Sequence, residues 1–359
     1  MIFSSHENIK IAGISVAIPS QKINVTDYYT SFGEETVDKF SEMAGVTQTT
    51  RAIDKQTASD LGFEAAIKLF EAKNINKEDI GILIFVSQKP DYRSPSTAFV
   101  LQKRLGLNHD IICFDINLAC SGFVFGLQTA HSLLNQSNKK LALLITADTS
   151  YKTLSPEDRT MIMLFGDSGS ALLLEKKETE NKNNQFGLRS NGYKFKSIIT
   201  PAGAFRNMDL KNIDEEWTDG ITRSDYNTHM KGMEVFGFSI TDVPKLIEDF
   251  FKTSVSQPSD YDTFALHQAN QYILKQLSRK NKIPFEKIPI SLDRYGNNSS
   301  NSVPLVLCDH YSKIENQNLR VFIAGFGAGL SWACGSIYIN TKDILPIHTT
   351  DNYYLEGKI

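Results

Sequence analysis

Cysteine is scarce in this chain of 359 residues, and long apolar runs are missing. The four cysteines, Cys113, Cys120, Cys308 and Cys334, form no C-x-x-C pair and no Cys/His cluster with zinc spacing. We therefore expect no metal site, and so few cysteines fit a reducing, cytoplasmic location. A membrane-spanning helix needs about 18 or more consecutive apolar residues, and no such run occurs, so we expect no membrane span.

Neither sign of charge is in large excess. Lys and Arg total 38 and Asp and Glu total 41, which gives a net charge of −3 at pH 7. Without a basic excess, nucleic acid is not an expected partner. The N-terminal stretch MIFSSHENIK lacks the charged and apolar regions of a secretory signal, so none is expected. The length predicts about two domains with a substantial core.

Apolar runs alternate with helical patterns along the chain. Strands are expected at 9–19, 81–88, 111–118, 141–148, 168–177 and 332–340. Three further strands are expected to run on into loops, within 261–270, 287–302 and 319–332. Helices are expected at 25–33, 34–45, 57–74, 94–106, 121–136, 271–282 and 302–314. This alternation predicts an α/β fold whose sheets are covered on both faces.

The order of these runs repeats weakly between two halves. The corresponding runs are 81–88 and 263–270, 111–120 and 288–297, and 141–148 and 320–327. We therefore predict an N-terminal half at 1–176 and a C-terminal half at 186–345, followed by a tail at 346–359. The tract KKETENKNNQ (176–185) is predicted to be a solvated connection between the halves.

The stretch DINLACSGFVFGLQ (115–128) joins a buried strand to an uncharged helix. Cys120 falls on the turn, at the N-terminus of that helix. The unpaired N–H groups and the helix dipole there are expected to lower the thiol pKa below its free value of about 8.5. Such a cysteine is a candidate nucleophile. The alternative is a buried cysteine that only fills space.

Other chemically suited residues also follow predicted strands. Ligands of open α/β sheets bind at the carboxyl ends of strands, where Cys120, His267, Asn297 and the glycine-rich loop 325–329 fall. An imidazole and a carboxamide both donate hydrogen bonds to a developing oxyanion. Each feature alone fits a plain strand end, turn or packing glycine. Together, and in this order, they indicate acyl transfer.

Five motifs resemble one family. DINLACSGF, FGDSGSALLL, HQAN, LDRYGNNSSNSVP and GFGAGLSW resemble the thiolase-fold condensing enzymes, specifically β-ketoacyl-acyl-carrier-protein synthase III, over residues 9–340. The resemblance implies a five-layer αβαβα fold with two duplicated halves, and a homodimer. It implies that Cys120, His267 and Asn297 are catalytic. It also implies an oxyanion hole made by the backbone N–H groups of Cys120 and Ala328. The family usually has glycine at the position of Ala328.

The implied reaction is a decarboxylative condensation. Cys120 would take an acyl group from acyl-CoA or an acyl carrier protein, and malonyl-acyl-carrier protein would then extend it. No metal or redox cofactor is implied. Lys39 and Met43 stand where relatives hold CoA with Trp and Arg, although Arg159 matches another CoA-contacting arginine. Ser94 replaces a bulky aromatic before Pro95, which predicts acyl groups longer than acetyl.

A basic pattern follows the HQAN motif. Lys275, Arg279, Lys280 and Lys282 are expected to form one stripe that docks an acidic carrier protein. A solvated helix face is the alternative. The stretch 203–227 is longer than the corresponding stretch of the family and is expected to reshape the entrance to the active site.

Other functions remain open on the sequence. One is an acyltransferase of the same fold that moves the acyl group to an alcohol or amine. Another is a non-catalytic partner subunit, against which the retained Cys120 argues. A hydroxymethylglutaryl-CoA synthase is not favoured, because this sequence has no glutamate where that enzyme's catalytic base is expected. The pathway served, whether fatty-acid initiation or a specialised lipid, polyketide or acyl-sugar route, is not specified by these residues.

Overall fold

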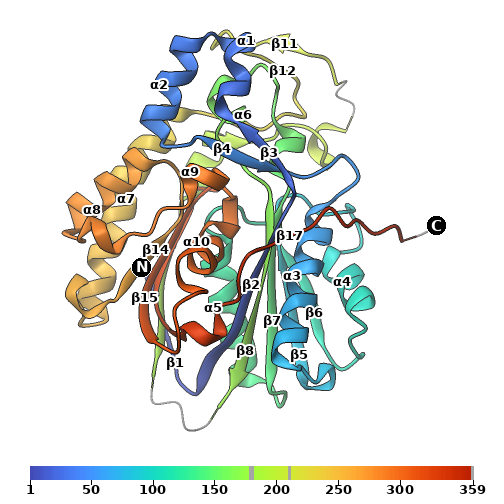
Figure 1. Ribbon diagram of the computed structural model, residues 1–359, viewed down its shortest axis with the longest axis vertical. Helices are drawn as coiled ribbons and strands as arrows, with labels where there is room; N and C mark the ends of the chain where they lie inside the picture. Colours follow the sequence, from blue (N-terminus) through green and yellow to red (C-terminus); the bar gives the residue numbers. More distant parts are fainter. Residues whose placement is uncertain (178–181, 209–211, 357–359) are drawn as a thin grey trace.

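The computed structural model describes residues 1–177, 182–208 and 212–356. Two large β-sheets run through the molecule (Figure 1). The first has the order β17-β2-β8-β7-β5-β6, with bounds His348–Thr349, Ile9–Ile18, Ser168–Lys176, Leu141–Asp148, Ile80–Val86 and Ile112–Ile116. The second has the order β1-β9-β16-β15-β14, with bounds Ile2–His6, Asn184–Ser190, Ser331–Asn340, Asn318–Gly327 and Thr263–Leu266.

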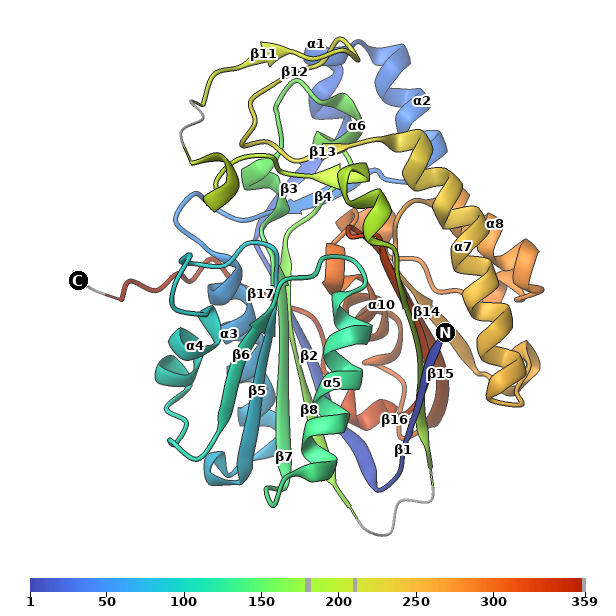
Figure 2. The same cartoon turned by 180° about the vertical axis from the view of Figure 1, so that it is seen from behind.

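Helices form three layers around these sheets. Figures 1 and 2 show α5 (Gly122–Gln136) and α10 (Ser302–Tyr311) between the sheets. The outer layers are α3 (Ala58–Lys73) with α4 (Thr97–Leu105), and α7 (Gly232–Thr253) with α8 (Gln271–Asn281). The predicted five-layer αβαβα fold is confirmed. The middle helices are apolar on several faces because both sheets cover them.

The two sheets share one topology. The order β2-β8-β7-β5 of the first sheet corresponds to β9-β16-β15-β14 of the second: in each, the first strand of the half is followed by the last, then by the one before it, and then by the second. The first sheet adds β6 beside β5, but the predicted strand at 288–291 does not form. Pro289 lacks a backbone donor, and the Gln268 side chain reaches the Pro289 carbonyl in place of a ladder bond, at 3.4 Å. The predicted strand in this segment is therefore wrong.

The ends of the chain cross between the halves. β1 pairs with β9 in the second sheet, and β17, from the tail, pairs with β2 in the first. The predicted halves at 1–176 and 186–345 therefore exchange their ends. The predicted solvated connection at 176–185 includes Asn184 and Gln185, which belong to β9 instead, and its residues 178–181 lie outside the described part.

Short elements cover the carboxyl ends of the parallel strands. They are β3 (Gln21–Asn24), α1 (Tyr29–Phe32), α2 (Glu34–Ala44), β4 (Gln48–Arg51), α6 (Arg159–Ile162), β10 (Ile198–Ile199), β11 (Glu215–Glu216), β12 (Thr222–Arg223), β13 (His229–Met230) and α9 (Leu292–Tyr295). Most of them gather at the top of Figures 1 and 2. Within the described ranges, no helix is both long and apolar enough to cross a membrane.

Local sequence signals set the helix ends. Thr57 and Asp60 form a capping box at the start of α3. Gly45 and Gly106 adopt left-handed conformations at the ends of α2 and α4, where a residue with a Cβ is strained. These predicted ends are confirmed.

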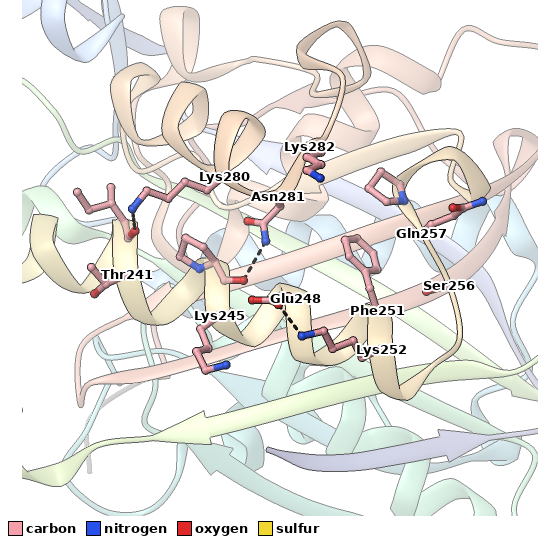
Figure 3. Close-up of a pocket in the computed structure, with 13 residues that line it drawn as sticks. Thr241, Lys245, Glu248, Phe251, Lys252, Ser256, Gln257, Lys280, Asn281 and Lys282 are labelled. Carbon is pink, nitrogen blue, oxygen red and sulfur yellow. Dashed lines mark hydrogen bonds and ion pairs between the residues drawn. The ribbon is translucent and has the colours of Figure 1, made fainter.

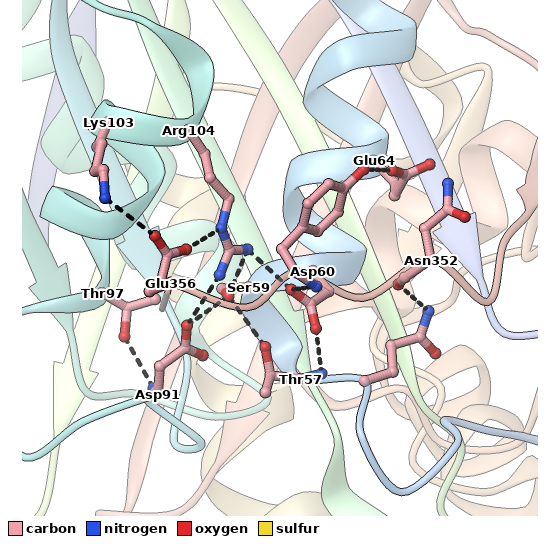
Figure 4. Close-up of polar contacts among 12 residues, drawn as sticks. Thr57, Ser59, Asp60, Glu64, Asp91, Thr97, Lys103, Arg104, Asn352 and Glu356 are labelled. Carbon is pink, nitrogen blue, oxygen red and sulfur yellow. Dashed lines mark hydrogen bonds and ion pairs between the residues drawn. The ribbon is translucent and has the colours of Figure 1, made fainter. Parts of the chain in front are cut away.

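The C-terminal tail is fastened to α3 and α4 by polar contacts (Figure 4). Arg104 donates to Asp60 at 2.9 Å and to Glu356 at 2.6 Å. Tyr354 packs edge-on against Phe63, with ring centroids 4.7 Å apart. Asp60 and Arg104 are almost fully buried, so the guanidinium neutralises a carboxylate that water does not reach.

Replacing Arg104 should therefore be costly. We expect Arg104→Met to lower the free energy of unfolding by about 3–5 kcal/mol, because Asp60 loses its buried cation. Lys103→Met is the matched control: Lys103 is 75% exposed and also pairs with Glu356, at 3.6 Å. Urea denaturation should show less than about 1 kcal/mol for the control. Equal effects would contradict this account of the cluster.

Candidate active site

Cys120 lies on the turn between β6 and α5, as predicted. The hairpin of β15 and β16 approaches this turn very closely. A Cβ built on Gly325 would lie 2.6 Å from the Cys120 carbonyl oxygen, and one on Gly327 would lie 3.2 Å from Cys120 Sγ. Only glycine permits this approach. The glycine-rich loop is thus placed against the cysteine.

Hydroxyl groups connect the same two segments. Ser331 donates to the Ala328 carbonyl at 2.8 Å, and Ser121 lies 2.7 Å from the Ser331 hydroxyl. Ala328 lies in the hairpin turn, and its N–H forms no hydrogen bond within the described part of the chain. The turn therefore presents a free backbone donor in the loop beside Cys120, where the resemblance placed the oxyanion hole.

Burial dominates the ionisation of Cys120. It raises the pKa of the thiol to about 12, and the nearby Asp148 carboxylate acts in the same direction. A hydrogen bond with Ser299 acts against this rise. The predicted lowering of the pKa by the helix N-terminus is therefore wrong for the free protein. At neutral pH the resting group is a thiol.

His267 directly follows β14 and is buried. Burial lowers the pKa of its imidazole to about 3, so the ring is neutral at pH 7. Its Nδ1 lies 3.1 Å from the Ser302 hydroxyl, which donates to the Ser299 carbonyl at 3.0 Å. Because that hydroxyl proton is engaged, Nδ1–H donates to Ser302, and Nε2 keeps its lone pair.

Asn297 lies in the turn after α9, with its backbone bonded to Leu164 and Gly166. Its Oδ1 accepts from the Ser299 N–H at 2.9 Å. This contact fixes the orientation of the amide, and Nδ2 has no hydrogen-bond partner among the described residues. Two N–H groups are therefore available to a ligand.

One cavity of about 480 Å³ brings the three predicted catalytic residues together. Cys120, His267 and Asn297 all line it, and apolar side chains form much of the remaining wall. A neutral thiol, a neutral imidazole and a fixed carboxamide therefore face one space. This arrangement is suited to a thioester whose carbonyl oxygen gains negative charge during reaction.

A second, smaller cavity of about 50 Å³ also touches Cys120. Asp148 and Lys89 line it, and neither was predicted as a site residue. Asp148 ends β7, and Lys89 lies just beyond the end of β5, which pairs with both β6 and β7. The strand-end rule that identified Cys120 applies to both, and extending it would have found them.

Of the predicted CoA-contacting and channel residues, only Met43 lines a cavity that touches Cys120. Met43 lines the 480 Å³ cavity, and Lys39 lies near it but pairs with Glu35 at 2.6 Å. Arg159 is exposed and begins α6, next to Thr160, which lines the cavity. Ser94 is exposed and lines neither cavity that touches Cys120. Their roles stay predictions.

The stretch 203–227 reaches α6. Arg223 is fully buried and donates to Asp158 at 2.7 Å and to Asp219 at 2.9 Å. Asp158 in turn caps α6 by accepting from the Thr160 N–H at 3.1 Å. The stretch therefore supports the helix that carries Arg159. Its residues 209–211 lie outside the described part.

The predicted basic stripe is not one surface. Lys275 lies near the cavity mouth, beside Met43 and Tyr272. Lys280 and Lys282 line a separate groove of about 740 Å³ between α7 and α8 (Figure 3), where Lys280 donates to the Ile240 carbonyl at 2.6 Å. Arg279 is exposed. Lys275 and Arg279 are four residues apart on one face of α8, but Lys280 lies about 100° further around the axis, and Lys282 follows the helix end at Asn281 in a left-handed conformation.

Comparisons with known proteins identify relatives of this chain. Models of the 3-oxoacyl-[acyl-carrier-protein] synthase III family match residues 114–192, and those of its C-terminal part match 252–339. A β-ketoacyl-[acyl-carrier-protein] synthase III of Acholeplasma laidlawii is 33% identical over 79% of this chain and 84% of its own. A 3-oxoacyl-(acyl-carrier protein) synthase structure from Burkholderia xenovorans is 32% identical, with a TM-score of 0.91, over 97% of this chain and 99% of its own.

The ionisation of Cys120 has a measurable consequence. With a pKa of about 12, its thiolate fraction rises roughly tenfold per pH unit from pH 7 to 10. We expect the rate of iodoacetamide alkylation at Cys120, followed by peptide mass spectrometry, to rise across this range without a plateau. A plateau near pH 7 would show that the helix N-terminus outweighs burial.

The close approach of the hairpin can be tested by adding one methyl group. Gly327→Ala would place a Cβ 2.9 Å from Cys120 Cβ, so the turn must shift. We expect the alkylation rate of Cys120 at pH 9 to change at least threefold. Gly237→Ala is the control, because a Cβ there meets no atom within 4 Å. An unchanged rate in Gly327→Ala would contradict the predicted crowding.

Proposed function

Because the chain belongs to the β-ketoacyl-acyl-carrier-protein synthase III family, we propose that Cys120, His267 and Asn297 carry out its decarboxylative condensation. The protein is an acyltransferase of the 3-oxoacyl-acyl-carrier-protein synthase type. The observation that supports these roles is the shared cavity, in which the free Nδ2 of Asn297, the His267 ring and Cys120 meet.

The first half-reaction transfers the primer. Cys120 Sγ attacks the thioester carbonyl, its proton passes to His267 Nε2, and the backbone N–H groups of Cys120 and Ala328 stabilise the oxyanion. The thioester C–S bond then breaks, and the leaving thiolate takes the proton. A neutral thiol and imidazole suit this sequence, because charge develops only when substrate is present.

The second half-reaction uses malonyl-acyl-carrier protein. Before this step His267 Nε2 takes up one proton from solvent. Loss of CO₂ breaks a C–C bond, and the electron pair forms an enolate whose oxygen accepts hydrogen bonds from His267 Nε2–H and Asn297 Nδ2. The carbanion attacks the acyl-Cys120 carbonyl. The Cys120 thiolate leaves and takes the proton from His267 Nε2, which gives 3-ketoacyl-acyl-carrier protein. These steps balance without an oxidant, a reductant or a metal.

The other candidate functions fit the site less well. Simple acyl transfer to an alcohol or amine does not need an oriented amide at Asn297. A non-catalytic subunit does not need a cysteine between two cavities. The family uses acyl carrier protein and acyl primers, so we propose both as partners of this chain. Lys275, near the mouth, is the predicted docking residue best placed to attract an acidic carrier.

We further propose a homodimer and a cytoplasmic location. The resemblance implies the dimer, and Ser94 would act on the primer from a partner subunit, since its own subunit leaves it exposed. The four cysteines are free thiols, which fits a reducing compartment.

Separate half-reactions distinguish these roles. With acyl-CoA and acyl-acyl-carrier-protein donors, intact-protein mass spectrometry should show an acyl adduct in the wild type and none in Cys120→Ala. Asn297→Asp should still form the adduct but release CO₂ from malonyl-acyl-carrier protein at least about 100-fold more slowly, because the donor is replaced by an acceptor. The adduct serves as the control for folding.

Two results would overturn the proposal. Discharge of the adduct by an alcohol or amine, without malonyl-acyl-carrier protein, would favour simple acyl transfer. No adduct from any donor would favour a non-catalytic subunit.

A further inference from the structure

Lys89 is an unusual group to find beside the reactive cysteine. Its Nζ makes no hydrogen bond, and no ion pair within 4.0 Å, to any residue in the described ranges. Its backbone is fixed, since Lys89 N–H donates to the Ser87 hydroxyl at 2.9 Å. Burial lowers the pKa of the ammonium group, while Asp148 and Asp167 oppose this. A partly buried cation without a direct protein partner leaves donors for a ligand.

The position of Lys89 is set by the sheet. The 50 Å³ cavity has Cys120 and Lys89 in its wall, and Lys89 also borders a surface groove of about 780 Å³. Cys120 also lines the 480 Å³ cavity that holds His267 and Asn297. An acyl group on Cys120 that occupies the smaller cavity therefore shares that cavity with Lys89.

Asp148 does not use up this cation. Its carboxylate accepts from the Gln88 N–H at 3.1 Å, from the Ser87 hydroxyl at 3.2 Å and from the Ser300 hydroxyl at 3.3 Å. Those donors satisfy both oxygens. The Gln88 side chain also borders the 50 Å³ cavity and has no hydrogen-bond partner within the described residues. Gln88 and Lys89, adjacent residues after β5, thus offer N–H groups to this cavity.

We propose that the primer is a short acyl group with a carboxylate at its far end, bound by Lys89 and assisted by Gln88. This inference rests on the proposed function, since it assigns the substrate class of that site. A water-sized group needs roughly 10–15 Å³, so the 50 Å³ cavity holds about four such groups. Two methylenes and a carboxylate approximately fill it. The expectation from Ser94, a chain longer than acetyl, is compatible with this size.

The test compares two acyl groups of matched shape. Succinyl and 4-methylpentanoyl thioesters have the same number and branching of heavy atoms beyond the carbonyl, but only succinyl carries a charge. With both CoA and carrier-protein donors, we expect the wild type to form the succinyl adduct at Cys120 at least 10-fold faster. Lys89→Met should reverse this preference, and Lys89→Arg should retain most of it.

The ratio of the two rates separates recognition from structure. If Lys89 only balances the charge of Asp148, Lys89→Met will slow both acyl groups equally and leave the ratio unchanged, which would overturn the inference. Arg93→Met is the control: Arg93 is an exposed cation that lines the 780 Å³ surface groove with Lys89 but does not border the 50 Å³ cavity. It should leave the ratio unchanged, whereas a lowered ratio would indicate general charge attraction and overturn the inference.

Failure of the proposed function would look different. It would leave Cys120 without any adduct, from the neutral or the charged donor. A wild type that accepts 4-methylpentanoyl readily and succinyl poorly would keep the condensing activity and reject only the carboxylate-ended primer.

Discussion

The close approach of the β15–β16 hairpin to the turn at Cys120 is the constraint on which the rest of the structure depends. Two glycines allow backbone to touch backbone, and the Ser121, Ser331 and Ala328 hydrogen bonds keep the two segments together. Because each segment belongs to a different sheet, their contact fixes how the halves meet. The cavity with His267 and Asn297 forms around that contact.

Burial then determines the resting charges. Cys120 and His267 are both neutral because burial disfavours their charged forms, and the fixed Asn297 amide is neutral by nature. Such a site holds little charge of its own on the side where a thioester enters. The charges lie on the other side, at Asp148 and Lys89, where the acyl chain ends. Reaction and primer recognition therefore occupy opposite sides of one sulfur atom.

The sequence predicted sheets covered on both faces, most strands and the position of Cys120 on its turn, because periodic apolar runs and strand-end residues are local signals. It missed what depends on contacts between distant segments. The segment at 288–291 reads as a strand, yet Pro289 and the Gln268 side chain keep it out of the ladder. The spacing of the four cations after HQAN predicts one basic stripe, yet Lys280 donates a hydrogen bond to the Ile240 carbonyl on α7.

By itself, the sequence determined the order of strands and helices, the cysteine turn and the motifs that resemble one family. Only the tertiary structure decided the ionisation of Cys120, because desolvation depends on what surrounds the sulfur, and a helix N-terminus seen in isolation suggests the opposite sign. It also decided that Lys89 lines the 50 Å³ cavity beside Cys120, since the parallel pairing of β5 with β6 places the ends of both strands together.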